Sequence, residues 1–157
     1  SQLLPVGKLD KHDQMAFNAI PQIDVAEENG FTLEEMKMVR ETKKIFDDDA
    51  IQVTTTCVRI PVMSGHSESI YVELEQDYEL EEVRQLFANA DGITLIDDLK
   101  QQKYPMPLEA EGKRDVFVGR LRRDLANTRA LNMWVVSDNL LKGAALNTVQ
   151  IAEHLVN

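Results

Sequence analysis

The sequence of 157 residues has one cysteine, Cys57, and no apolar run of the length that spans a membrane. A single cysteine excludes an internal disulfide and a cysteine-rich metal site. The three histidines, at positions 12, 66 and 154, are too scattered for a local metal motif, so we predict no metal. Residues 1–10 lack the charged start and apolar centre of a signal peptide, which favours a cytoplasmic protein.

Positive charge is also scarce, because 17 Lys and Arg residues face 27 Asp and Glu residues and the formal net charge is −10. Nucleic acids and anionic membrane surfaces are bound through basic patches, so we expect neither as a partner. The seven glycines are too widely spaced for a G-x-G-x-x-G phosphate-binding turn. The length is that of one hydrophobic core, and we predict a single domain over residues 1–157.

Apolar periodicity predicts an α+β fold, with a mixed or antiparallel sheet of about five strands and helices on one face. Thr32 and Glu35 form a capping box, which starts a helix expected to end near Phe46. Further helices are predicted over 12–20, over 77–91 and from 137 or 138 to 155. Strands are predicted over 51–59, 66–75, 93–96, 114–124 and 131–137, the last two as an antiparallel hairpin.

Three details of the C-terminal half bear on packing. Alternation over 114–124 predicts Val118 and Arg120 on one side of the strand and Leu121 on the other. Small residues at 143–145 indicate close packing of the last helix on the sheet. The irregular connection over 97–112 favours an interface, and Trp134 is either an interface anchor or a core residue.

The break at 61–65 separates two predicted strands. Arg59 ends the first strand and His66 begins the second, so a permanent cation and a residue type that titrates near neutral pH lie beside one loop. On spacing alone, the plain alternative is an exposed charge and a turn residue. A hydrolase that uses His66 with Ser64 or Ser67 is a weaker alternative, because neighbours on a turn rarely reach the required geometry.

The string C-V-R-I-P-V-x-S-x-H-S-E-S over residues 57–69 closely resembles the segment of bacterial aspartate-semialdehyde dehydrogenases that carries a substrate-binding Arg and an acid/base His. The resemblance covers nearly the whole chain and includes segments 16–24, 41–45, 118–124 and 134–145. It implies a fold similar to the C-terminal domain of glyceraldehyde-3-phosphate dehydrogenase. It also implies a homodimer, a small-molecule substrate and NADP as the cofactor.

The resemblance implies a role for each matching residue. Arg59 would bind the substrate α-carboxylate through a two-bond fork, and His66 would shuttle the proton. In the E-T-x-K motif, Glu41 would contact the substrate amino group and Lys44 the phosphate. On spacing alone this pair is a weak exposed ion pair. Asn139 would contact the nicotinamide of the cofactor.

The Gly-rich dinucleotide domain and the nucleophilic cysteine of that family are missing from this sequence. Cys57 lies in a β-rich run with nothing to activate its thiol, so we expect an inert residue. The activity implied by the resemblance is NADPH-dependent reduction of β-aspartyl phosphate to aspartate semialdehyde, in lysine, threonine and methionine biosynthesis. We expect the chain alone to be inactive and to be the C-terminal part of such an enzyme. A non-catalytic dimerisation or small-ligand-binding module is the alternative.

Overall fold

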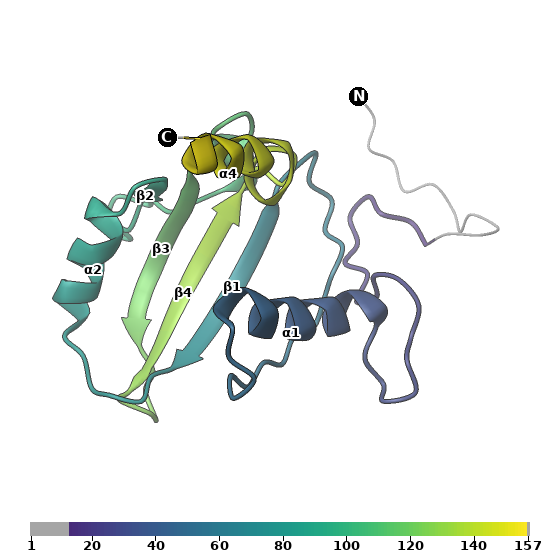
Figure 1. Cartoon of the computed structure of the whole chain (residues 1–157), viewed down its shortest axis with the longest axis horizontal. Coiled ribbons are helices and arrows are strands. Elements are labelled where there is room, and N and C mark those ends of the chain that lie inside the picture. The colour runs from purple at the N-terminus through teal and green to yellow at the C-terminus, as the bar shows by residue number, and fades with distance from the viewer. Residues whose placement is uncertain (1–12, 157) are drawn as a thin grey trace. The chain divides into compact units, whose positions relative to one another are not determined.

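The computed structural model describes residues 13–156 (Figure 1). The chain divides into two compact units, Ser1–Pro61 and Val62–Asn157. The prediction of a single domain stays a prediction. The elements are α1 Leu33–Phe46 in the first unit and, in the second, β1 His66–Glu73, α2 Leu80–Asn89, β2 Ile93–Leu95, α3 Pro107–Ala110, β3 Val116–Arg123, β4 Ala130–Ser137, η1 Leu141–Ala145 and α4 Leu146–Val156. No helix within the described range is both long and apolar enough to cross a membrane.

Helix α1 confirms the predicted capping box. The Thr32 hydroxyl accepts a hydrogen bond from the backbone N–H of Glu35, and the Glu35 carboxylate accepts one from the backbone N–H of Thr32 at 2.7 Å. The same carboxylate accepts the backbone N–H of Cys57 at 2.8 Å. These bonds, with the one from Thr32 first, lower the pKa of Glu35 below its ordinary value because they favour the charged form. One side chain therefore starts the helix and holds a distant segment of the same unit.

Two predictions for the first unit are wrong. Residues 13–20 form a turn and no helix, while residue 12 lies outside the described range. The predicted strand over 51–59 forms no regular ladder, although alternate residues along it are half-buried. Its one bridge pairs Arg59 with Ile20 through N–H to carbonyl bonds of 2.9 and 3.0 Å. The backbone N–H of Cys57 donates to the Glu35 carboxylate, so it is not available to pair with a neighbouring strand.

The second unit is built on a four-stranded sheet in the order β1-β4-β3-β2. The predicted β3–β4 hairpin is confirmed, β1 is antiparallel to β4, and β2 is parallel to β3. The expected number of about five strands included the segment over 51–59, which forms no ladder. The α+β class with a mixed sheet is confirmed.

Helix α2 covers one face of this sheet (Figure 1). The buried side chains of Val118, Leu121 and Leu131 pack there against apolar residues of the helix, among them Val83 and Phe87. The predicted range 77–91 is longer than the observed Leu80–Asn89. On the opposite face, a smaller cluster holds Ala110, Phe117 and Val136, with Ile96 and Trp134 packed against it.

Strand β3 departs from the predicted alternation at Arg120. The register shifts between Gly119 and Arg122, and Arg120 has a φ of 57°, the left-handed conformation found in one type of β-bulge. Leu121 therefore shares the buried cluster of Val118 instead of pointing to the other face. Arg120 and Arg122 are both exposed.

A buried carboxylate, that of Asp97, holds the bulge. It accepts the backbone N–H of Arg120 at 2.7 Å and that of Leu121 at 3.1 Å. The Asp97 side chain is 5% exposed and forms an ion pair with Arg84, whose guanidinium also donates to the carbonyl of Leu121 at 3.1 Å. The peptide groups that the bulge removes from the ladder are therefore satisfied by side chains.

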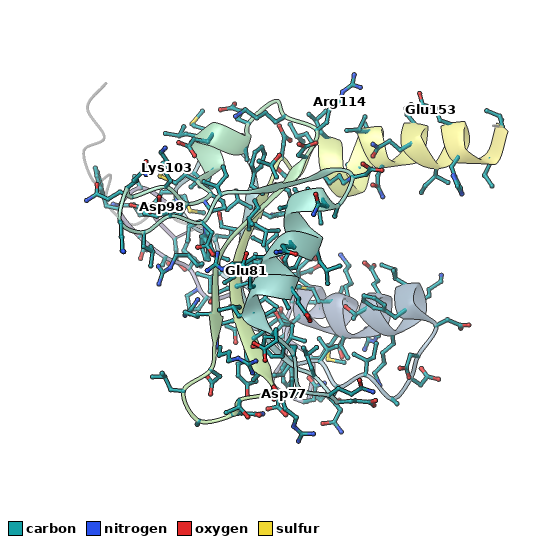
Figure 2. All side chains as sticks on the ribbon, turned by 90° about the vertical axis from the view of Figure 1, so that its left-hand side faces the viewer. Asp77, Glu81, Asp98, Lys103, Arg114 and Glu153 are labelled. Atoms are coloured by element: carbon teal, nitrogen blue, oxygen red, sulfur yellow. The ribbon has the colours of Figure 1, made fainter. Side chains whose placement is uncertain are left out.

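The connection between β2 and β3 is more ordered than an irregular loop. Asp98 and Lys103 face one another through two backbone hydrogen bonds of 2.8 and 3.0 Å, and both side chains lie in the same part of Figure 2. The short helix α3 follows, with Pro107 at its first position, where the missing N–H costs no helical bond.

The last helix begins later than predicted. Residues 142–144 are non-helical and α4 starts at Leu146. Gly143 has a φ of 82°, and a Cβ at that position would meet nothing within 4 Å. The backbone conformation, and not close packing on the sheet, therefore requires this glycine.

Candidate functional site

His66 is the first residue of β1 and lies opposite Ser137 in β4. It is exposed, so its imidazole is accessible to a ligand. The residue before it, Gly65, donates its backbone N–H to the side-chain oxygen of Asn139 at 2.9 Å. Two of the predicted site residues, His66 and Asn139, are therefore brought together through the backbone of the loop that carries the histidine.

Gly65 is required at its position by geometry. Its φ is 91°, a conformation that other residues rarely adopt. A Cβ there would lie 3.0 Å from the carbonyl oxygen of Ser137 and 3.9 Å from the Cβ of Pro107. The loop thus enters β1 against the end of β4, and His66 begins the strand with its backbone direction set.

Asp138 fixes the segment that carries Asn139. Its carboxylate accepts the backbone N–H of Gly112 and that of Leu140, each at 2.8 Å, and only 5% of the residue is exposed. These two bonds, with that from Gly112 first, lower the pKa of Asp138 because they stabilise the carboxylate. The sequence indicated residue 137 or 138 as the start of the last helix. The contact of Asp138 with Gly112 is long-range and leaves no local signal.

The other predicted site residues belong to the first unit. Glu41 and Lys44 are exposed on α1, and no ion pair joins them within the described part of the chain. Arg59 is exposed, and its backbone is held by the bridge to Ile20. All three side chains are therefore accessible to an anionic or zwitterionic ligand. The roles that the resemblance gives them stay predictions.

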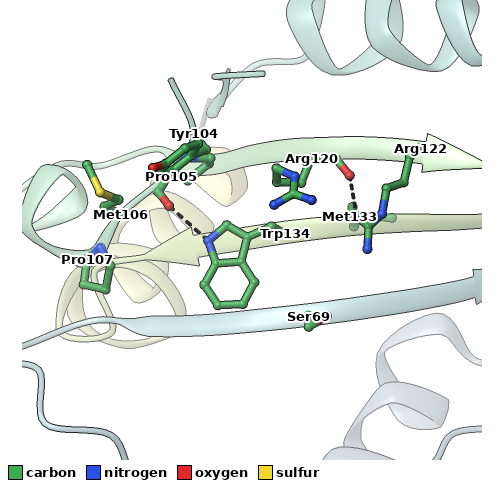
Figure 3. Close-up of a pocket in the computed structure, with 9 residues that line it drawn as sticks. All are labelled: Ser69, Tyr104, Pro105, Met106, Pro107, Arg120, Arg122, Met133 and Trp134. Carbon is green, nitrogen blue, oxygen red and sulfur yellow. Dashed lines mark hydrogen bonds between the residues drawn. The ribbon is translucent and has the colours of Figure 1, made fainter. Parts of the chain in front are cut away.

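A cavity of about 380 Å³ lies on the sheet face opposite α2 (Figure 3). The indole N–H of Trp134 donates to the carbonyl of Pro105 at 3.0 Å, and Arg122 donates to the carbonyl of Arg120 at 2.8 Å. The cavity was not predicted, because the β-bulge that turns both arginines to this side has no sequence signature here. Its lining residues are Ser69, Tyr104, Pro105, Met106, Pro107, Arg120, Arg122, Met133 and Trp134.

The charge of this cavity is unbalanced. Within residues 13–156 neither Arg120 nor Arg122 pairs with a carboxylate, whereas Arg84 and Arg123 do. The cavity thus places two guanidinium groups beside an aromatic ring in a chain with a net charge of −10. The surface is therefore suited to a carboxylate-bearing partner.

Among residues 13–156, no cluster of three or more His, Cys, Asp or Glu side chains has the proximity that a metal ion needs. The expectation that no metal is bound stays a prediction.

The chain is similar to known proteins along most of its length. The family described as semialdehyde dehydrogenase, dimerisation domain, matches residues 3–142. The chain is 56% identical over 155 residues to the aspartate-semialdehyde dehydrogenase of Bacillus subtilis. This alignment covers 98% of this chain and 45% of the relative. It is 55% identical over 143 residues to the enzyme of Aquifex aeolicus, and this alignment covers 91% of this chain and 42% of the relative.

Solved structures agree with this similarity. Aspartate semialdehyde dehydrogenase II from Vibrio cholerae, complexed with ASA, matches with a TM-score of 0.87 and 49% identity, over 92% of this chain and 42% of that chain. The enzyme from Candida albicans with NADP matches with a TM-score of 0.70 and 25% identity, over 88% of this chain and 44% of that chain. The chain spans a little under half the length of the curated relatives named above.

Proposed function

The chain belongs to the semialdehyde dehydrogenase dimerisation-domain family, and from this premise we propose that it supplies the substrate-binding and dimerisation part of an NADP-dependent aspartate-semialdehyde dehydrogenase. The reaction would be the reduction of β-aspartyl phosphate to aspartate semialdehyde with release of phosphate. The observation that carries the proposal is the 56% identity over 98% of the chain to an enzyme of that name. The cytoplasm is the compartment that we propose for it.

In this proposal His66 is the acid and base. It stands at the start of a regular strand, exposed to a ligand and preceded by Gly65, whose φ is 91° and which lies beside the end of β4. Addition of hydride to an acyl carbon produces negative charge on the carbonyl oxygen, and an imidazole N–H can donate to that oxygen as the charge develops. A group held on a rigid element meets the positional demand of such a step.

The substrate groups suit the exposed charges of the first unit. We assign the substrate α-carboxylate to Arg59, because a guanidinium can make two parallel hydrogen bonds to one carboxylate. The substrate amino group is assigned to Glu41 and the phosphate to Lys44, which lie one turn apart on α1. Each assignment pairs a charged side chain with a group of opposite charge.

Asn139 has donors that fit a carboxamide of the cofactor. Its side-chain oxygen is engaged by Gly65, while its NH₂ group makes no hydrogen bond within the described residues. That group can donate to a carbonyl oxygen. Bound NADPH would supply the hydride, and Asn139 would orient the ring that carries it.

The homodimer that we propose uses the sheet face around Trp134. On this face Ser69 pairs with Trp134 and Tyr71 pairs with Asn132, while α2 covers the opposite face. The Tyr71 side chain is 48% exposed. Because Pro105 already accepts the indole N–H of Trp134, a partner can cover the ring without leaving a buried donor unpaired. Arg120 and Arg122 supply charges that orient the partner.

We expect the purified chain to be a dimer at micromolar concentration. Trp134→Ala should raise the dimer dissociation constant by about thirtyfold or more, the scale of a buried aromatic anchor at an interface. Sedimentation equilibrium measures the mass of the wild-type chain and the dimer dissociation constants of the wild type and the variant. Circular dichroism checks that the variant is folded. Leu86→Ala is the matched control, because Leu86 is exposed on α2 and lies outside the proposed face. A monomer mass for the wild-type chain would contradict the homodimer.

We also expect the 157-residue chain alone to show no dehydrogenase activity. It contains no Gly-rich phosphate turn, and it lacks the nucleophilic cysteine that the resemblance implies for the family. The measurement is NADPH formation from aspartate semialdehyde, NADP and phosphate, with the Bacillus subtilis enzyme as the positive control. Turnover above background would show that the chain carries a nucleophile and a cofactor site of its own.

A further inference from the structure

The contact between Asn139 and Gly65 joins two segments that are 74 residues apart in sequence. One end is the loop residue next to His66, and the other is a side chain just beyond the end of β4. The bond runs from a backbone N–H to an amide oxygen at 2.9 Å, which is the usual length for such a pair. It is therefore a direct link between Asn139 and the backbone that carries His66.

Both ends of this link lie in ordered surroundings. A Cβ at Gly65 would lie 3.0 Å from the carbonyl oxygen of Ser137, so the Gly65 loop passes close to the end of β4. The Asn139 backbone follows Asp138, whose buried carboxylate is bonded to Gly112 and Leu140. A hydrogen bond between two segments that are each ordered restrains their relative position, whereas a bond to a flexible segment would not.

The orientation of the amide follows from this bond. Because Gly65 donates, the atom that it contacts must be the oxygen of Asn139, and the NH₂ group points elsewhere. The two ends of the side chain therefore have separate partners. An Asp at this position keeps the oxygen acceptor and loses the NH₂ donor, while a Leu of similar size loses both.

We propose that Asn139 is a positioning residue for His66, and that it acts by holding the backbone of Gly65. The inference rests on the proposed function, in which His66 is the acid and base. It differs from the role that the resemblance implies, because contact with the cofactor uses only the NH₂ group of Asn139. The oxygen of Asn139 serves the histidine instead.

Amide hydrogen exchange of the 157-residue chain tests the contact. In Asn139→Leu, we expect the Gly65 amide to exchange about fivefold faster or more, the scale of one lost hydrogen bond. In Asn139→Asp, it should stay as protected as in the wild type. The amides of Gly112 and Leu140 are internal controls, because Asp138 holds them in all three proteins and unchanged protection shows that the fold is intact.

Steady-state kinetics of the complete enzyme tests the function. Asn139→Leu should lower kcat by about tenfold to a hundredfold, the cost of misplacing a catalytic group by a fraction of an ångström to about one ångström. The KM for NADP should rise equally in Asn139→Leu and Asn139→Asp, because both lose the NH₂ group that is assigned to the cofactor. The kcat of Asn139→Asp should be higher than that of Asn139→Leu, because the Gly65 N–H regains its acceptor.

Four outcomes would overturn the proposal. The first is a Gly65 amide as protected in the Leu variant as in the wild type. The second is an equal rise in the KM for NADP in both variants with kcat unchanged, which would leave Asn139 as a cofactor contact only. The third is a wild-type enzyme without turnover, which would remove the proposed function as well. An active wild type with an unaffected Leu variant would remove the positioning role alone.

Discussion

Replacement of Arg59 by lysine should lower kcat/KM of the complete enzyme for aspartate semialdehyde by about a hundredfold or more. A planar guanidinium that grips a carboxylate with two hydrogen bonds sets both the position and the orientation of the substrate. An ammonium keeps the charge but loses the fixed orientation, and a displaced substrate reacts more slowly. The expected loss is about 3 kcal/mol of transition-state stabilisation.

Initial-rate kinetics with varied aspartate semialdehyde measures this loss. Arg40→Lys is the matched control, because Arg40 is an exposed arginine of the same unit that pairs with Glu27 and has no proposed contact with substrate. It should leave kcat/KM nearly unchanged. An Arg59→Lys enzyme with the wild-type kcat/KM would exclude Arg59 from the carboxylate role.

The second large effect is expected at His66. His66→Asn should reduce kcat by about a hundredfold or more, the usual contribution of a general acid and base. The KM for the substrate should stay close to the wild-type value, because the charged groups that bind it are on other residues. Asparagine keeps a hydrogen-bonding side chain of moderate size but cannot take up and release a proton near neutral pH.

The control for His66 is His154→Asn in α4, which is exposed and outside the proposed site. Single-turnover and steady-state rates of both variants separate a slower chemical step from slower product release. If kcat of His66→Asn equals that of the wild type, His66 is a turn residue without a role in proton transfer.

The predictions differ in which part of the proposal they test. The dimer experiment uses the chain by itself and concerns only the face around Trp134. The Arg59 and His66 experiments need the complete enzyme and concern the chemistry. If the chain forms a dimer but the Arg59 and His66 substitutions leave the kinetics of the complete enzyme unchanged, the results would support the non-catalytic dimerisation module instead.

Local signals predicted the elements that depend on neighbours in sequence. The Thr32 and Glu35 capping box predicts the start of α1, because both of its bonds are made within one turn. The two apolar strands with a short connection predict the β3–β4 hairpin for the same reason. The position of His66 beside a Gly-containing loop also follows from the sequence. The match of its segment to one that carries an acid/base histidine in a known family follows from the sequence as well.

One error occurs where a distant group competes for the backbone. The predicted strand over 51–59 has the right alternation, but Glu35 of α1 takes the backbone N–H of Cys57. In that case the acceptor lies far from its donor in the chain. The predicted last helix is instead interrupted at residues 142–144, where Gly143 has a φ of 82°, and α4 starts at Leu146.

The sequence by itself determined the fold class, the main helix start and the hairpin. Its resemblance to a known family supplied the candidate residues, whose roles stay predictions: Glu41, Lys44, Arg59, His66 and Asn139. Only the tertiary structure decided that Asp97 supports a bulge which turns Arg120 toward Trp134, and that Asn139 bonds to Gly65. The physical reason is the same for both. Periodicity and capping report bonds within a few residues, whereas a buried carboxylate or amide chooses among backbone donors that only the folded chain brings within reach.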